Sequence, residues 1–140
     1  MSLYTFDASV FISAFISQEL HHSTSQACLS RLRVEGEILA CPTLLPVEVA
    51  AALARNTGDN SRSQHFALSL ASLPSMRLFA LSEGLVELAV QAAVESRLRG
   101  ADAVYAAVAI QQKATLITWD QQMLTRTATL VKVMTPEHYC

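Results

Sequence analysis

Leu3-Tyr4-Thr5-Phe6-Asp7-Ala8-Ser9 is a short apolar segment that ends at an acidic residue and continues into a stretch with helical spacing. Segments of this kind alternate with longer helical stretches along the chain. The expected strands are 3–6, 37–41, 76–81, 115–119 and 130–134, and the expected helices are 9–17, 23–34, 44–55, 61–73, 83–98 and 103–112. Because strands that alternate with helices form parallel sheets covered on both faces, we expect an α/β fold with a central sheet of about five parallel strands.

The length and composition are typical of one folded domain. The chain has 140 residues, of which 51% are hydrophobic and 16% are charged, so we expect a single domain over residues 1–140. No apolar run reaches the roughly 18 residues that a membrane-spanning helix needs. The N-terminus has no basic start, and Asp7 interrupts its apolar stretch. We therefore expect neither a membrane span nor a signal peptide.

The three cysteines bear on the cellular compartment. Cys28, Cys41 and Cys140 have no spacing typical of a metal site, and any disulfide scheme leaves one of them unpaired. This pattern favours a reducing cytoplasm.

The charge of the chain argues against one class of nucleic-acid binder. The net charge is −2, whereas a domain that coats nucleic acid through bulk charge is basic. Individual arginines still suit phosphate, because the guanidinium fork matches its geometry. Arg97 and Arg99 precede Asp102 and are candidates for such contacts. A solvated helix end is the alternative, in which Arg99 pairs with Glu95 one turn back.

Four acidic residues lie at or near the boundaries of the predicted elements. Asp7 follows the first strand, and Asp120 follows the fourth. Asp102 begins the helix that leads into the fourth strand, and Glu48 lies in the opening turns of the helix after the second strand. Because ligands of parallel sheets bind beyond the carboxyl ends of the strands, we expect these four carboxylates to meet. The simpler explanation is that each aspartate caps a helix and that Glu48 is solvated.

The residues around these acids indicate what would compensate their charge. Apolar residues flank Glu48, Asp102 and Asp120, and a carboxylate in such surroundings needs a partner or a cation. Several carboxylates in one pocket repel each other, and a hard divalent cation removes that conflict. Oxygen ligands without a histidine or cysteine cluster favour Mg²⁺ or Mn²⁺ over Zn²⁺. The only histidine pair, His21-His22, is expected in a solvated loop. A Ser-His-Asp nucleophile has no G-x-S-x-G motif to support it.

Four motifs in series resemble those of PIN-domain ribonucleases, and most closely those of VapC-type toxins of toxin–antitoxin pairs. The motifs are Tyr4-Thr5-Phe6-Asp7-Ala8-Ser9, Pro46-Val47-Glu48, Gly100-Ala101-Asp102-Ala103-Val104-Tyr105 and Leu116-Ile117-Thr118-Trp119-Asp120. Together they span nearly the whole chain, and its length also matches the family. The resemblance implies a single PIN-like domain with Mg²⁺- or Mn²⁺-dependent endoribonuclease activity on RNA. It also implies a homodimer that a cognate antitoxin inhibits.

The resemblance assigns roles to individual residues. Asp7, Glu48, Asp102 and Asp120 occupy the acidic positions of the family, as metal ligands and catalytic residues. Ser9 and Thr118 match its hydroxyl residues, which would position the acids or the phosphate; local helix capping is the other explanation. Some relatives carry a further acid where this chain has Gln121 and Gln122, so a second metal ion is not implied. Trp119 is expected to pack at a strand end, in preference to stacking on a base.

Two other classes of protein stay open at this point. One is a non-catalytic PIN-like module that binds RNA or a protein partner, although all four acids are intact. The other is a phosphatase or a receiver domain with Asp7 as the phosphate acceptor. The phosphatase would want an aspartate where the chain has Ser9. The receiver would want an acidic pair near the first strand and a lysine after a late strand, and neither is evident.

Overall fold

A five-stranded parallel sheet forms the centre of the protein in the computed structural model, which describes residues 2–139. All four strand pairs are parallel, and the strand order is β3-β2-β1-β4-β5. The strands are β1 (Leu3–Phe6), β2 (Ile38–Pro42), β3 (Met76–Phe79), β4 (Thr115–Ile117) and β5 (Val133–Met134). The predicted α/β class and the five parallel strands are confirmed. The last strand begins three residues later than predicted, because residues 128–130 form a turn.

Eight helices surround this sheet within residues 2–139, and six of them match the predicted stretches to within about three residues at each end. The helices are α1 (Ala8–Phe15), α2 (His22–Glu35), α3 (Leu44–Thr57), α4 (Asn60–Ala71), α5 (Glu83–Ser96), α6 (Gly100–Gln112), α7 (Gln121–Arg126) and α8 (Pro136–Tyr139). The expected helix list lacked α7 and α8, which are too short to produce a repeating apolar pattern. None of the helices in residues 2–139 has the length and apolar character to cross a membrane.

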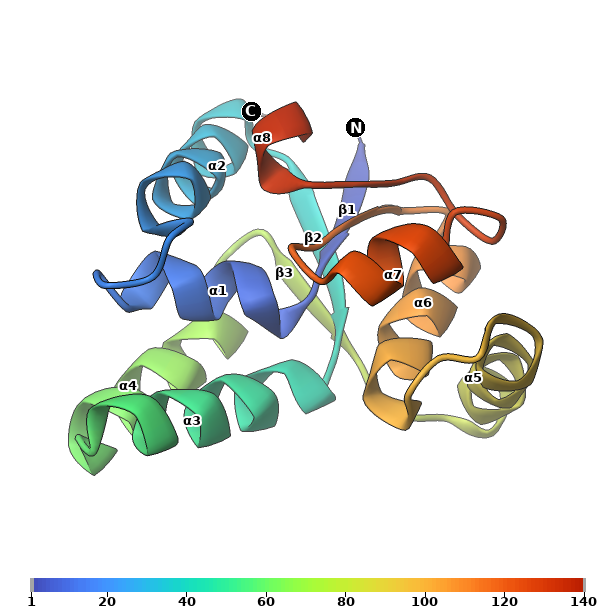
Figure 1. Cartoon of the computed structure of the whole chain (residues 1–140), viewed down its shortest axis with the longest axis horizontal. Helices are drawn as coiled ribbons and strands as arrows, with labels where there is room; N and C mark the ends of the chain where they lie inside the picture. Colours follow the sequence, from blue (N-terminus) through green and yellow to red (C-terminus); the bar gives the residue numbers. More distant parts are fainter. Residues whose placement is uncertain (1, 140) are drawn as a thin grey trace.

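The sheet is covered on both faces, and neighbouring residues of β2 belong to different apolar clusters. Leu39 of β2 belongs to one buried cluster, together with Phe6 and Phe11. Its neighbour Ala40 belongs to a second cluster, with Leu85 and other residues of α5 and α6. Figure 1 shows α1 to α4 on one side of the strands and α5 and α6 on the other. Cys28 and Cys41 are buried in the first cluster, and Cys140 lies outside the described residues.

The crossover between β3 and β4 contains two helices that pack against each other. Arg97 ends α5 in the left-handed conformation, with φ of 55°, and Arg99 precedes α6 with extended backbone. The chain therefore reverses between the two helices, and α5 packs on α6 while α6 contacts β1, β2 and β4. The sequence did not determine the orientation of α5, and the structure places it on the outside of α6 (Figure 1).

The direction of winding changes at β1, and this change determines where a ligand can enter. From β1 the chain moves to β2 and then to β3 on one side, and it returns past β1 to β4 and β5 on the other. The crossovers that leave β1 and β4 therefore run toward opposite edges of the sheet. Open parallel sheets bind their ligands at such a switch point.

We predict that Leu116→Ala lowers the free energy of unfolding by about 2–5 kcal/mol, because it leaves a cavity inside a packed core. Leu116 lies in β4 between β1 and β5 and is 0% exposed. Leu68→Ala is the matched control, because Leu68 is 59% exposed on α4, and we expect a change within about 0.5 kcal/mol. Urea denaturation measures both values, and equal effects of the two substitutions would contradict the described core.

Candidate active site

Asp7 lies directly after β1 and is held by hydrogen bonds to both of its carboxylate oxygens. Its Oδ1 accepts hydrogen bonds from the Ser9 backbone N–H at 3.2 Å and from the Ser9 hydroxyl at 2.5 Å. Its Oδ2 accepts one from the Thr118 hydroxyl at 2.6 Å. The carboxylate thus caps α1, as an aspartate before a helix is expected to do. It is only 6% exposed, so these hydrogen bonds replace most of its hydration.

The pKa of Asp7 indicates which charges surround it. Burial is the largest cause and raises the pKa of Asp7 to about 6, against an ordinary value of 3.8. The hydrogen bonds from Ser9 and Thr118 lower it, whereas the negative charges of Asp102 and Asp120 raise it further. The structure therefore brings three of the four predicted acids near enough to interact electrostatically, at the carboxyl ends of β1 and β4.

Ser9 and Thr118 also join the two strand ends to each other. The Ser9 hydroxyl accepts a hydrogen bond from the Trp119 backbone N–H at 3.1 Å, and the Thr118 hydroxyl accepts one from the Asp120 backbone N–H at 3.0 Å. Each hydroxyl therefore accepts from the backbone after β4 and donates to Asp7 after β1. The two hydroxyls thus link Asp7 after β1 to the backbone of Trp119 and Asp120 after β4.

Asp120 and Asp102 lie at the starts of two different helices. Asp120 caps α7 through its Oδ1, which accepts a hydrogen bond from the Met123 backbone N–H at 3.0 Å. Asp102 lies in the first turn of α6 but is not its cap, since Arg99 occupies that position. The explanation of Asp102 as a helix cap is therefore wrong, although those of Asp7 and Asp120 hold. Burial raises the pKa of Asp102, Arg99 lowers it, and Asp120 raises it.

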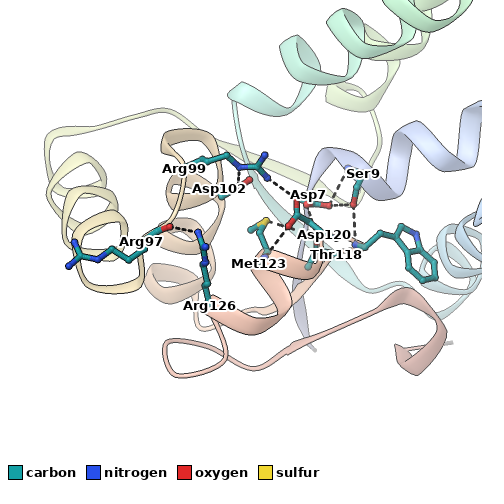
Figure 2. Close-up of polar contacts among 10 residues, drawn as sticks. Asp7, Ser9, Arg97, Arg99, Asp102, Thr118, Asp120, Met123 and Arg126 are labelled. Carbon is teal, nitrogen blue, oxygen red and sulfur yellow. Dashed lines mark hydrogen bonds and ion pairs between the residues drawn. The ribbon is translucent and has the colours of Figure 1, made fainter.

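Arg99 forms ion pairs with both of these acids. Its Nε donates to Asp102 Oδ2 at 2.9 Å, and its Nη2 donates to Asp120 Oδ2 at 2.8 Å. Figure 2 shows the guanidinium reaching from the start of α6 across to Asp120. The alternative pairing of Arg99 with Glu95 is wrong, because the guanidinium pairs with Asp102 and Asp120, while Glu95 accepts a hydrogen bond from Gln91. Local spacing suggested Glu95, whereas Asp120 is 21 residues away and becomes a partner only through the fold.

Glu48, the fourth predicted acid, lies on α3 and interacts electrostatically with Tyr105 of α6. Tyr105 lies three residues after Asp102 on α6 and so faces the same side of that helix. Burial raises the pKa of its hydroxyl, and the charge of Glu48 is the next cause. This hydroxyl is fully enclosed and has no hydrogen-bond partner among residues 2–139. Asp7 also contributes to the shift, so the Tyr105 hydroxyl is near enough to both carboxylates to interact with their charges.

The aromatic and histidine residues near the site have structural contacts. The Trp119 indole N–H donates to the Ser25 hydroxyl at 2.8 Å, and its ring stacks on His21 with 3.6 Å between centroids. The expected packing of Trp119 at the strand end is thus present. His22 Nδ1 lies 2.9 Å from the Ser13 carbonyl oxygen. His21 lies in the turn before α2 and His22 begins that helix; both are half-buried, so the pair is less solvated than expected.

The chemistry of this site suits a hard cation. The donors are carboxylate and hydroxyl oxygens, which magnesium and manganese prefer. No three of the acids, histidines or cysteines in residues 2–139 are arranged as a ready metal-binding group. Asp102 and Asp120 instead hold the guanidinium of Arg99, so a positive charge already lies between two of the acids. The donor chemistry therefore suits a divalent cation, while in this arrangement the Arg99 guanidinium occupies the place between Asp102 and Asp120.

The fold and the site define a single α/β domain with an acidic centre at the switch point of its parallel sheet. The family model described as the PIN domain matches residues 4–130, so the chain belongs to the PIN domain family. Comparison of the sequence with curated proteins gives no match.

Solved structures share this fold over nearly the whole chain. The toxin VapC20 of Mycobacterium tuberculosis is 19% identical with a TM-score of 0.74, covering 93% of this chain and 98% of its own. FitAcB from Neisseria gonorrhoeae is 22% identical with a TM-score of 0.72, covering 96% and 99%. A toxin–antitoxin complex from Klebsiella pneumoniae is 21% identical with a TM-score of 0.67, covering 97% and 98%. At these identities the likeness shows the fold.

We predict that Asp7→Asn stabilises the metal-free protein at pH 7.5 and that this advantage disappears near pH 4. The folded-state pKa of Asp7, about 6, lies above the ordinary value of 3.8. The stability that protonated Asp7 provides is therefore fully present below pH 3.8 and is lost as the pH rises through about 6. The full change in the free energy of unfolding that corresponds to this pKa shift is on the order of 3 kcal/mol. Denaturation of both proteins in chelator, at several pH values between 4 and 7.5, measures it.

Asp59→Asn is the matched control, because Asp59 caps α4 without being buried. If burial did not disfavour the Asp7 charge, the free energies of unfolding of Asp7→Asn and wild type would differ by the same amount from pH 4 to 7.5. Such a result would contradict the prediction.

Proposed function

We propose that this protein is a metal-dependent endoribonuclease that hydrolyses RNA phosphodiester bonds and acts as the toxin of a toxin–antitoxin pair. The observation that carries the proposal is the buried Asp7 carboxylate, which two hydroxyls hold at the carboxyl ends of β1 and β4 beside Asp102 and Asp120. A site that only shaped the fold would not need three mutually repelling carboxylates in one place.

Membership in the PIN domain family and the solved structures of similar fold support this function. VapC20 of Mycobacterium tuberculosis is described as a toxin that cleaves the sarcin-ricin loop, which is RNA. The Klebsiella pneumoniae structure is described as a toxin–antitoxin complex. By analogy, the proposal includes an antitoxin partner, a homodimer and action in the cytoplasm.

The proposed reaction depends on the acids as ligands of Mg²⁺ or Mn²⁺. Asp7, Asp102 and Asp120 would hold the cation directly or through water, and Glu48 would complete the shell or orient the attacking water. Asp7 Oδ2 accepts one hydrogen bond and keeps a free lone pair, so the carboxylate retains the capacity to bind through that oxygen. When bound, the cation polarises a phosphoryl oxygen and lowers the pKa of an attacking water.

Ser9 and Thr118 would serve the reaction by fixing the direction of the Asp7 carboxylate. Their hydroxyl protons point at Asp7, because each hydroxyl oxygen already accepts a backbone N–H. Partners of this kind set the orientation and basicity of a ligating carboxylate. The enclosed Tyr105 hydroxyl is suited to the same task for Glu48, since it lies beside that carboxylate.

We predict that Asp7→Asn and Asp102→Asn abolish metal-dependent RNA cleavage, and that Thr118→Val reduces it about 10–100-fold, as expected for a residue that orients a metal ligand. The valine keeps the shape of Thr118 but removes its hydrogen bond to Asp7. The measurement uses purified protein without antitoxin on labelled tRNA and other RNAs, with Mg²⁺, Mn²⁺ or chelator.

The control for these variants is Asp59→Asn, the same chemical change at a helix cap outside the acidic site. Circular dichroism verifies that each variant is folded. Cleavage that persists in chelator, or full activity of both aspartate variants, would contradict the mechanism. Inactivity of the wild type on many RNAs would favour a non-catalytic PIN-like module that binds RNA or a protein partner.

A further inference from the structure

Arg99 differs from the other residues at the acidic site in its exposure and its reach. Its side chain is 63% exposed, whereas those of Asp102 and Asp120 are 16% and 28% exposed. It nevertheless donates to one oxygen of each acid, and these acids come from different helices. A flexible cation with one end in solvent can leave such a position at a small free-energy cost, because exposed ion pairs contribute little to stability.

The position of the guanidinium coincides with the place where positive charge is needed most. It lies between Asp102 Oδ2 and Asp120 Oδ2, the same carboxylates whose charges raise the pKa of Asp7. The Arg99 guanidinium carries a permanent positive charge. A divalent cation that binds Asp102 and Asp120 has to compete with this guanidinium for their oxygens.

We propose that Arg99 is an internal counter-cation that a divalent metal ion displaces, and that the released guanidinium binds an RNA phosphate at the edge of the site. This inference rests on the proposed ribonuclease function. In the metal-free protein Arg99 keeps the two acids paired and in place. After displacement its backbone still lies at the start of α6, so its side chain stays within reach of a substrate bound to the acids. A guanidinium suits phosphate, because its fork can donate two parallel hydrogen bonds.

Arg97 provides a matched control on the same loop. It lies two residues before Arg99, and Figure 2 shows its side chain directed away from the acids. Its backbone carbonyl accepts a hydrogen bond from Arg126 at 2.7 Å, a contact that a side-chain substitution leaves available. Arg97→Gln therefore removes the same charge at a similar place in the sequence without removing the bridge.

The first experiment measures Mn²⁺ affinity by calorimetry on wild type, Arg99→Gln, Arg99→Lys and Arg97→Gln. Arg99→Gln removes two exposed ion pairs that compete with the metal. The Mn²⁺ affinity of this variant should therefore be roughly 3- to 30-fold higher than that of the wild type. Arg99→Lys should have an intermediate affinity, because lysine keeps the charge but cannot bridge both acids with a planar fork. Arg97→Gln should bind as the wild type does. An Arg99→Gln affinity equal to or weaker than that of the wild type overturns the proposal.

The second experiment distinguishes displacement from repulsion at a distance. In the NMR spectrum of ¹⁵N-labelled metal-free protein, the Nε–H of Arg99 is expected as a protected signal that is missing in Arg99→Lys. Saturation with diamagnetic Mg²⁺ should abolish that protection. A signal that stays unchanged with Mg²⁺ bound overturns the proposal, because Arg99 would then remain on the acids.

The third experiment tests the phosphate contact with RNA at saturating Mn²⁺. Arg99→Gln should raise KM for RNA and reduce the slope of log affinity against log salt by about 0.7, the value for one phosphate contact on a single strand. Tighter metal binding with weaker RNA binding is a pair of opposite effects that loss of structure would not produce. Unchanged KM and salt slope overturn the phosphate role.

These outcomes separate the inference from the proposed function. If the wild type binds Mn²⁺ and cleaves RNA with it but Arg99→Gln binds the metal no more tightly, the inference fails and the function stands. If neither protein binds Mn²⁺ and neither cleaves RNA, both proposals fail.

Discussion

The hydrogen bond between the Thr118 hydroxyl and the Asp7 carboxylate, 2.6 Å long, joins the ends of the two strands that form the candidate site. Asp7 is almost fully buried, and a buried carboxylate is tolerated only when hydrogen bonds replace its hydration. Ser9 supplies the other contacts and at the same time accepts the backbone N–H of Trp119. The spacing of β1 and β4 at their carboxyl ends, the start of α1 and the direction of the acid therefore depend on one another.

The same constraint explains why a cation would stabilise the site. Burial and neighbouring negative charges both oppose ionisation of Asp7, and the two hydroxyls offset this only in part, since its pKa stays raised at about 6. Asp102 and Asp120 are more exposed and pair with Arg99. An apolar or fully paired arrangement at this place would make the folded protein more stable. Such a loss of stability is typical of functional sites. A divalent cation would remove the repulsion that the hydrogen bonds leave.

Most of the fold could be predicted because its signals are local. The apolar segments and helical stretches gave the strand and helix order, and the rule for parallel sheets then placed Asp7 and Asp120 at one edge. The helix α7 was not in the expected list because six residues hold less than two turns of any pattern. Leu130 is apolar but lies in a turn, so the last strand is shorter than its composition suggests. These errors concern short helices and the ends of elements, and they leave the predicted α/β class and parallel sheet unchanged.

The contacts of the site are harder to predict, because they depend on where distant helices begin. Local spacing offered Glu95 as one possible partner of Arg99, but the reversal at Arg97 turns the start of α6 toward Asp120. The spacing of apolar residues in the sequence does not predict that reversal. The two sides of the site therefore differ in burial and contacts. Asp7 is buried and fixed by the sheet, whereas the Arg99 side chain is exposed and held by its two ion pairs. The topology determines the buried part of the site, whereas the ion pairs of the exposed part depend on the reversal between α5 and α6.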